Sequence, residues 1–411
     1  MVSPAINRES LAAMPFESRR EAILEWIRAR TAARFGVAAE RISLDRPPDN
    51  PLAFLAILHG PLHRELGLLL NRQDASSFVS IRMAATHVAR EIEMPPVPVQ
   101  PLTELFDKGA WGWGPLERNF GKRLELPVVF ILSATRSGST LLRIMLAGHP
   151  GLFAPPELTL LPFASLRQQA IQAEALDYLW IRSGLPSAFQ EAEQLSMART
   201  VTELQALERD DVPMPAIFDR LQRAADPRIL VDKSPFNSFH PEWLGYAERI
   251  FSQARYIHLV RHPLPSIESF VRMRFHRLFG RHWLIWDGDP WHYGEKFWTS
   301  ANRQIMDFLA GIDPERQLRV AFEKLVTDPA TATGEICRFL GVPHDRAVLA
   351  PYAGNRMVRD FSASGPAAGD PSFLLRSGID PAFASLTKRA FPSWPFGEPT
   401  RDVAARLQYS I

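Results

Sequence analysis

The clearest pattern of apolar and polar positions runs over residues 127–150, PVVFILSATRSGSTLLRIMLAGHP. Residues 128–132 are an unbroken apolar run, which is typical of a buried strand. Residues 141–147 have the apolar content and spacing of a helix, and a short polar turn, 133–140, separates the two segments. The pattern therefore predicts a strand that leads into a helix through a tight turn.

Short apolar segments alternate with helical patterns along the rest of the chain. Three more segments are typical of strands: 229–231, 256–260 and 318–322. Helical patterns fill most of residues 158–205, with breaks at Pro162 and Pro186, and return over 330–340 and 400–408. Strands that alternate with helices predict an α/β fold, with a P-loop-like parallel sheet flanked by helices on both faces.

The first 92 residues have a different pattern, with apolar positions at helical spacing and no strand signal. Three helices are expected there: 19–35, 52–66 and 77–92. A proline-rich stretch, PPVPVQP, comes next and is typical of a stiff linker. We therefore predict a small helical domain over 1–92, a proline- and aromatic-rich linker over 93–125, and the α/β domain over 126–411.

Composition narrows the class of protein. The 411 residues carry 47 Lys and Arg against 45 Asp and Glu, so a net charge of +2 gives no strong attraction for nucleic acid or membranes. The single cysteine, Cys337, excludes an intrachain disulfide and a cysteine-based metal cluster. The first residues lack an apolar signal core, and the longest apolar run, 52–58, is too short to span a bilayer. We expect a cytoplasmic location.

The turn at 133–140 has the chemistry of an anion site. The backbone N–H groups at a helix start converge on one spot and favour negative charge. Arg136 adds a full charge, Ser137, Ser139 and Thr140 add hydroxyls, and Gly138 lets the backbone approach a ligand closely. The nucleotide-triphosphatase pattern GxxxxGK[ST] is not met, because Ser139 replaces its Lys. The alternative is an ordinary strand–helix turn that carries an arginine and serines.

A second candidate anion site comes directly after the segment 256–260. Ligands of open parallel sheets bind beyond the carboxyl ends of strands, where both this turn and the turn at 133–140 would lie. Arg261 and Ser269 flank a proline-shaped turn into a helix, a spacing that can bring a guanidinium and a hydroxyl onto one phosphate. Alone, the pattern is more typical of a surface turn. Together, the two turns indicate a ligand with two separated phosphate groups.

With these two turns the chain resembles the sulfotransferases that use 3'-phosphoadenosine 5'-phosphosulfate (PAPS), and most closely the sulfotransferase domains of polyketide and olefin synthases. RSGST, residues 136–140, matches their 5'-phosphosulfate loop, and Arg261 and Ser269 match their 3'-phosphate residues. Further matches in order and spacing are APPEL (154–158), VDKSP (231–235), FEKLVTDP (322–329) and FLGV (339–342). The resemblance runs from about residue 126 onwards. It implies PAPS as sulfuryl donor, bound in part by Arg136, and no metal requirement.

The general base is open between two residues. Glu157, in the Pro-Pro-Glu turn, could face the acceptor, although a glutamate at a helix start is also common. His240 is the second candidate. Lys233 is expected to contact the donor or the acceptor side, or else to pair with a neighbour such as Asp232. His262 is expected to brace the turn after Arg261.

Three further features have open interpretations. The tryptophan-rich segment 272–298 is either a lid over an apolar acceptor or a peripheral packing element. The segment 369–373 occupies the place where sulfotransferases close a loop over the donor, but it lacks their RKG pattern. Arg356 and Arg376 are candidate phosphate contacts.

The order of helices in residues 1–92 resembles an acyl carrier protein. Carrier proteins attach phosphopantetheine to a serine at the start of the second helix, and here that region reads PDNPLA, with no Ser or Thr. The resemblance implies a module that cannot be loaded and acts in docking or structure. The alternative is an unrelated helical cap.

The resulting hypothesis is a sulfotransferase that moves a sulfuryl group from PAPS to a hydroxyl. In the polyketide-type relatives that hydroxyl lies β to a thioester on a carrier protein, so a loaded carrier is one expected partner. No thioesterase region is recognised after the sulfotransferase pattern. A small diffusible alcohol or phenol is the alternative acceptor. A P-loop kinase is a less favoured class, because the Lys and a magnesium-binding Asp are missing. The sequence does not indicate the oligomeric state.

Overall fold

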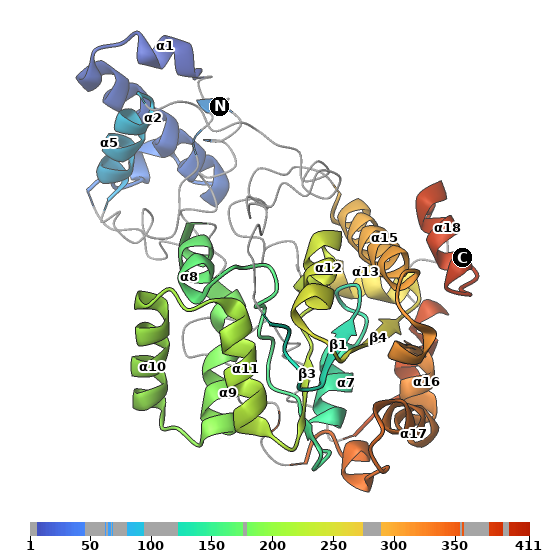
Figure 1. Ribbon diagram of the computed structural model, residues 1–411. Helices are drawn as coiled ribbons and strands as arrows, with labels where there is room; N and C mark the ends of the chain where they lie inside the picture. Colours follow the sequence, from blue (N-terminus) through green and yellow to red (C-terminus); the bar gives the residue numbers. More distant parts are fainter. Residues whose placement is uncertain are drawn as a thin grey trace. The chain divides into compact units, whose positions relative to one another are not determined.

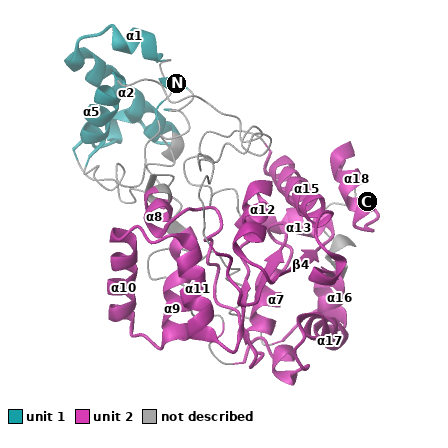
Figure 2. Cartoon of the chain, viewed as in Figure 1, with its two compact units in different colours: residues 1–105, 277–288 teal, residues 106–276, 289–411 magenta. Residues whose placement is uncertain are grey.

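The computed structural model describes most of the chain: residues 6–45, 62, 65–66, 68, 80–93, 122–175, 179–273, 289–353, 356, 378–388 and 394–411. The chain divides into two compact units, one containing the N-terminal helices and the other the sheet (Figure 2). They are described separately.

The N-terminal unit is helical, as expected. Its described helices are α1 (Arg8–Ala12), α2 (Phe16–Phe35) and α5 (Ile81–Glu91). Helix α2 begins three residues earlier than the predicted 19–35 and ends at Gly36, whose φ of 66° suits a left-handed cap. Helix α5 begins after Ser80, which caps Met83 N at 3.2 Å. Most of the predicted helix 52–66 and the PDNPLA segment lie outside the described residues.

One buried cation ties these helices together. The side chain of Arg19, on α2, donates to the carbonyl oxygens of Leu11 (2.9 Å) and Ala89 (3.0 Å) and to Glu93 (2.9 Å). Apolar residues of α2 and α5, among them Trp26, Ile27 and Val88, form the core beneath it. Apolar residues at helical spacing therefore hold the described helices of this unit together. Arg19 adds hydrogen bonds to carbonyl oxygens near the C-terminal ends of α1 and α5.

The second unit contains a five-stranded parallel sheet in the order β2-β3-β1-β4-β5. Its strands are β1 (Val128–Leu132), β2 (Leu152–Phe153), β3 (Ile229–Asp232), β4 (Ala254–Val260) and β5 (Gln317–Ala321). The four predicted strands are confirmed, and β2 is an addition. The α/β fold with a parallel sheet is therefore confirmed.

The helices of this unit lie around the sheet (Figure 1). In chain order they are α7 (Ser139–Leu146), α8 (Leu166–Ala175), α9 (Gly184–Glu193), α10 (Met197–Arg209), α11 (Met214–Ala225), α12 (Pro241–Ile250), α13 (Pro263–Arg272), α15 (Pro290–Leu309), α16 (Phe322–Thr327), α17 (Pro329–Leu340) and α18 (Glu398–Arg406). Helix α18 begins two residues before the predicted 400–408.

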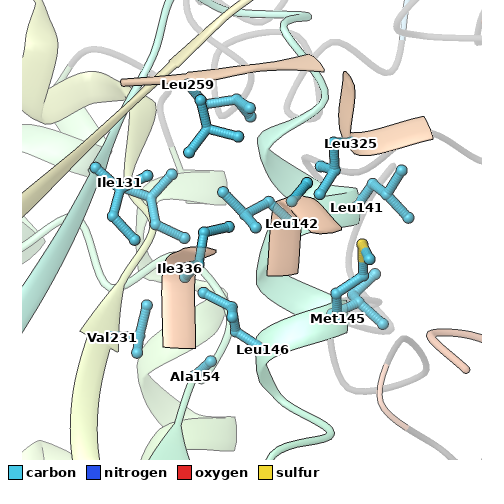
Figure 3. Packing of buried hydrophobic residues seen from close by; sticks show 14 of the residues in the cluster. Ile131, Leu141, Leu142, Met145, Leu146, Ala154, Val231, Leu259, Leu325 and Ile336 are labelled. Atoms are coloured by element: carbon cyan, nitrogen blue, oxygen red, sulfur yellow. The ribbon is translucent and has the colours of Figure 1, made fainter. Parts of the chain in front are cut away.

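Side chains of the central strand β1 point alternately to the two faces of the sheet, and each face packs against a different kind of residue. Ile131 points into an aliphatic cluster with Leu142 and Leu146 of α7 and Ile336 of α17 (Figure 3). Phe130, whose side chain points to the other face, packs instead against aromatic rings: Phe218 of α11, Phe251 and Tyr256. Both faces are covered, so β1 is a continuous apolar run, as is usual for a central parallel strand.

Part of the tryptophan-rich segment belongs to this packing. Residues 290–298 are the first turns of α15, and Trp298 is buried with its indole Nε1 donating to Arg261 O at 2.9 Å. The contacts of Trp298 agree with the packing interpretation. Residues 274–288 lie outside the described part of the chain.

Candidate active site

The turn after β1 has the sharp backbone expected of an anion loop. Arg136 and Gly138 both have a left-handed conformation, with φ of 68° and 88°. A Cβ atom at Gly138 would lie 2.2 Å from Cδ2 of Phe322, so the position needs glycine for its backbone and for its space. The turn delivers the chain directly into α7, which starts at Ser139.

Buried polar atoms gather at this turn. Ser133 and Ser137 have no exposed surface, and neither Oγ finds a hydrogen-bond partner among the described residues. Helix α7 has no side-chain cap, so its first N–H groups also remain available. Unpaired buried donors cost free energy unless a ligand satisfies them, and these donors fit an anionic group such as a phosphate or a sulfate.

Arg261 lies beside this turn, directly after β4. Its NH1 donates to Arg136 O at 3.0 Å, and its guanidinium lies 4.3 Å from the centroid of the Phe322 ring. The residue is buried, its Nε has no partner among the described atoms, and burial lowers its pKa to about 10. A desolvated guanidinium with a free donor fits a phosphate group.

The two predicted anion sites form one site. Arg136 Nε donates to Ser269 Oγ at 3.1 Å, and Arg261 donates to the backbone of Arg136. The family resemblance assigns the Arg136 side chain to the 5' end, whereas here it contacts the serine assigned to the 3'-phosphate. Arg136, Arg261 and Ser269 thus lie together at the carboxyl ends of β1 and β4.

Glu157 and Lys233 form a buried ion pair on the other side of the turn. The Lys233 side chain is 2% exposed and that of Glu157 is 17% exposed. Lys233 Nζ also lies 3.4 Å from Thr140 Oγ1, in the first turn of α7. The alternative pairing of Lys233 with Asp232 is not observed, because Asp232 accepts from Ser234 (2.5 Å) and Asn237 (3.1 Å).

A second layer fixes Glu157. Ser234 Oγ accepts from Thr159 N at 2.9 Å and donates to Asp232, so the turn after β3 holds the segment that carries Glu157. Burial raises the pKa of Asp232 to about 6, against the lowering effect of these hydrogen bonds. Gly184 packs on the Glu157 backbone so closely that a Cβ there would lie 2.1 Å from Glu157 O.

The histidines have different environments. His240 is the N-cap of α12, and its Nδ1 accepts from Glu242 N at 3.2 Å. Burial lowers its pKa, so the ring is neutral near pH 7, and no described hydrogen bond links it to Glu157 or Lys233. His262 braces the turn after Arg261, as expected: its backbone N donates to Glu323 at 3.0 Å.

Arg356 is not part of this site. Its NH1 donates to Ala347 O (3.0 Å) and Ala350 O (3.2 Å), and it packs on Gly148, just beyond the C-terminal end of α7. The turn at 133–138 lies at the opposite end of that helix, about 12 Å away by helix rise. The expectation that Arg356 contacts a phosphate is therefore wrong. Arg376 and residues 369–373 lie outside the described residues.

Two features of the site were not apparent from sequence. Phe322 lies under Arg261 and against Gly138, but an aromatic residue at the end of an apolar strand looks like ordinary core. Ser234, between Asp232 and the Glu157 segment, carried no signal beyond its place in the VDKSP match. The parallel pairing of β2 with β3 brings the Ser234 and Glu157 segments together. The pairings of β1 with β4 and of β4 with β5 bring Phe322 to Arg261 and Gly138.

In the described ranges, no cluster of His, Cys, Asp or Glu has the makeup of a metal site. None of the described helices combines the length and apolar character that crossing a membrane requires.

The parallel sheet and these strand-end residues form a site suited to an anionic ligand, and comparison with known proteins gives the family. The model of the sulfotransferase family matches residues 127–346, so the chain belongs to that family. The sulfotransferase domain from the curacin biosynthetic pathway is 38% identical, with a TM-score of 0.65, and the match covers 71% of this chain and 100% of that domain.

The sulfotransferase domain of the Synechococcus PCC 7002 olefin synthase is 36% identical, with a TM-score of 0.64, over 72% of this chain and 98% of that domain. Among curated proteins, protein-tyrosine sulfotransferase 1 of Danio rerio is 27% identical over 228 residues, which is 55% of this chain and 56% of that protein. The chain thus spans about half the length of such curated relatives. The resemblance inferred from the motifs is confirmed.

Proposed function

We propose that this protein transfers a sulfuryl group from PAPS to a hydroxyl acceptor. The observation that carries the proposal is the cluster of Arg261, Arg136 and Ser269 next to the Ser133–Ser137 donors. Two anion-binding turns meet there, and several buried donors have no partner among the described residues. A donor with a 5'-phosphosulfate and a 3'-phosphate matches both turns.

Each side chain has a role in this proposal. PAPS supplies an activated sulfuryl group and a nucleotide leaving group. The α7 N-terminus, Ser137, Ser139 and Thr140 would hold the 5' end, where negative charge grows as the bond to sulfur breaks. Arg261 and Ser269 would hold the 3'-phosphate, and Arg136 would link the two ends.

The ion pair would act at the acceptor. Glu157 would accept the hydroxyl proton, and Lys233, held between Glu157 and Thr140, would stabilise charge on the sulfuryl oxygens. His240 is the second candidate base, and its capping hydrogen bond uses Nδ1 and leaves Nε2 for another role. Transferring a proton and orienting two substrates are the main tasks that such a site must perform.

For the acceptor we propose a β-hydroxyacyl chain held on a separate carrier protein. Two observations support this choice: the similarity to the curacin-pathway and olefin-synthase domains, and the motif resemblance to polyketide-type sulfotransferases. A small diffusible alcohol or phenol is the alternative. The protein-tyrosine sulfotransferases among the relatives support a phenolic hydroxyl at lower identity, but not a diffusible one.

The test has two stages. Calorimetry first measures binding of adenosine 3',5'-bisphosphate to the wild type and to Arg261→Ala. Loss of a buried charge contact predicts at least about thirtyfold weaker binding by the variant. Absence of wild-type binding would refute the proposal. Mass spectrometry then compares sulfuryl addition to a β-hydroxyacyl carrier, the same acid in free form, and a simple phenol. Transfer to the phenol alone would select the alternative acceptor.

A further inference from the structure

The turn that carries Arg261 is supported by a segment far along the chain, residues 407–411, which come directly after α18. The groups that take part are the Glu323 carboxylate, the Tyr409 hydroxyl, the His262 imidazole and the Ser410 carbonyl. Because these groups lie at the nucleotide end of the site described above, the role inferred for them rests on the proposed function.

Glu323 is the centre of this support. Its Oε1 accepts the backbone N–H of His262 at 3.0 Å, and its Oε2 accepts the hydroxyl of Tyr409 at 2.8 Å. Both carboxylate oxygens are therefore used to hold other parts of the chain. Its neighbour Phe322 is the ring on which the Arg261 guanidinium lies. Displacement of Glu323 would move both the backbone after Arg261 and the surface beneath its side chain.

His262 makes a second link to the same segment. Its Nδ1 accepts from Leu264 N at 3.2 Å, so the neutral ring carries its proton on Nε2, which faces Ser410 O at 3.3 Å. The ring also meets Tyr409 edge-on, with 5.5 Å between centroids. Burial lowers the pKa of His262 and raises that of Tyr409, which keeps the imidazole neutral and the phenol protonated near pH 7.

The segment itself is anchored from the other side. Glu295 on α15 is buried and accepts hydrogen bonds from Gly397 N (2.7 Å) and Thr400 Oγ1 (2.6 Å). These bonds fix the start of α18 on α15, and the helix then leads to Tyr409. Residues 394–411 thus bridge from α15 to the turn after β4.

We propose that Tyr409, acting through Glu323, is a positioning residue for the 3'-phosphate end of the donor site. The Arg261 side chain is desolvated, so its affinity for a phosphate depends on the direction of its donors. Glu323 sets that direction through the next residue's backbone, and Tyr409 holds Glu323. Tyr409 itself touches neither the nucleotide nor the reacting atoms.

The test compares two nucleotides that differ only in the 3'-phosphate. Calorimetry measures the affinity for adenosine 3',5'-bisphosphate and for adenosine 5'-phosphate in the wild type and in Tyr409→Phe. We expect the substitution to weaken bisphosphate binding by about fivefold to tenfold and to leave 5'-phosphate binding within about twofold. A loss of general stability would lower both affinities alike.

Tyr256→Phe is the matched control. Like that of Tyr409, the Tyr256 hydroxyl donates to a glutamate, here Glu248, at 2.5 Å. Tyr256 is buried and lies on β4, the strand that precedes Arg261. It lies on β4 about 16 Å before Arg261 by strand rise, away from the turn. We expect thermal unfolding to shift in this variant while the ratio of the two affinities stays at the wild-type value.

A double-mutant cycle with Glu323→Ala tests the route. If Tyr409 acts through Glu323, the Tyr409→Phe change has no further effect on the affinity ratio once Glu323 is gone. An unchanged ratio in Tyr409→Phe, or equal losses for both nucleotides, would overturn the positioning role and leave the proposed function intact. A wild type that does not prefer the bisphosphate would overturn both.

Discussion

The Nε of Arg136 donates a hydrogen bond to the Oγ of Ser269 at 3.1 Å, across 133 positions of sequence. This contact joins the turn after β1 to the helix after β4. Because Arg261 also donates to Arg136 O, the two turns are held in one arrangement. A ligand that binds one turn therefore meets side chains already ordered by the other.

Ser269→Ala should weaken the binding of adenosine 3',5'-bisphosphate by about tenfold to a hundredfold. The substitution removes both a hydroxyl assigned to the 3'-phosphate and the partner that orients Arg136, which together are worth about one hydrogen bond to a charged group. Isothermal calorimetry provides the measurement. Thr333→Val on α17 is the control, since Thr333 is also buried and its Oγ1 donates to Pro329 O at 2.7 Å within its own helix. Equal losses in both variants would contradict a specific role for Ser269.

Gly138→Ala should abolish nucleotide binding and lower the free energy of unfolding by about 1–3 kcal/mol. The new Cβ would require a left-handed backbone at φ 88° and would overlap the ring of Phe322. Chemical denaturation and calorimetry measure the two effects. Gly334→Ala on α17 is the control, because nothing lies within 4 Å of a Cβ there, and a small gain in stability is expected. Retained binding by Gly138→Ala would show that the turn does not hold the nucleotide.

Local patterns were sufficient to predict the elements that build the site. The apolar run of β1, the polar turn and the amphipathic start of α7 are adjacent in sequence, and each has its own periodicity. Strand β2 was not predictable in this way. It has two residues, Leu152 and Phe153, and it exists through pairing with Ile229 and Leu230.

Partners far apart in sequence could not be assigned. Lys233 has an acidic neighbour in Asp232, but neighbouring residues of extended backbone point in opposite directions. Its partner is Glu157, which lies 76 positions away and follows β2, the strand that pairs with β3 at the edge of the sheet. The left-handed backbone of Arg136 was equally hidden, since a φ of 68° is uncommon for a residue with a side chain.

Glu157→Gln should lower kcat by about 10²- to 10⁴-fold, which is the range for loss of a general base, while affinity for adenosine 3',5'-bisphosphate stays near the wild-type value. The amide keeps the shape of the side chain but cannot accept the hydroxyl proton. Steady-state sulfuryl transfer gives kcat, and Glu242→Gln, at an exposed position on α12, is the matched control.

His240→Gln separates the two candidate bases. If Glu157 is the base, this change should alter kcat by less than about tenfold, because the His240 ring serves mainly to cap α12 through its Nδ1. The same transfer assay applies, with thermal unfolding to register the lost cap. A large loss of kcat in His240→Gln, combined with a small one in Glu157→Gln, would assign the proton transfer to the histidine.

Asp232 should make stability depend on pH in a direction unusual for a carboxylate. Its pKa is raised to about 6 in the folded protein, chiefly by burial, from 3.8 in the unfolded chain. The folded state therefore binds this proton more tightly. The resulting stabilisation is complete below about pH 4, falls as the pH rises through 6, and is then lost.

Relative to Asp232→Asn, which does not titrate, the wild type should lose about 2–3 kcal/mol of unfolding free energy between pH 4 and pH 7. Urea denaturation across this range measures the difference. Asp328→Asn is the control of opposite sign. Asp328 is exposed, and hydrogen bonds from the Thr331 side chain and then from Thr331 N (3.2 Å) lower its pKa, so its contribution appears as the pH rises. A wild-type advantage over Asp232→Asn that does not change with pH would mean that Asp232 titrates normally and that its burial imposes no cost on the turn holding Glu157.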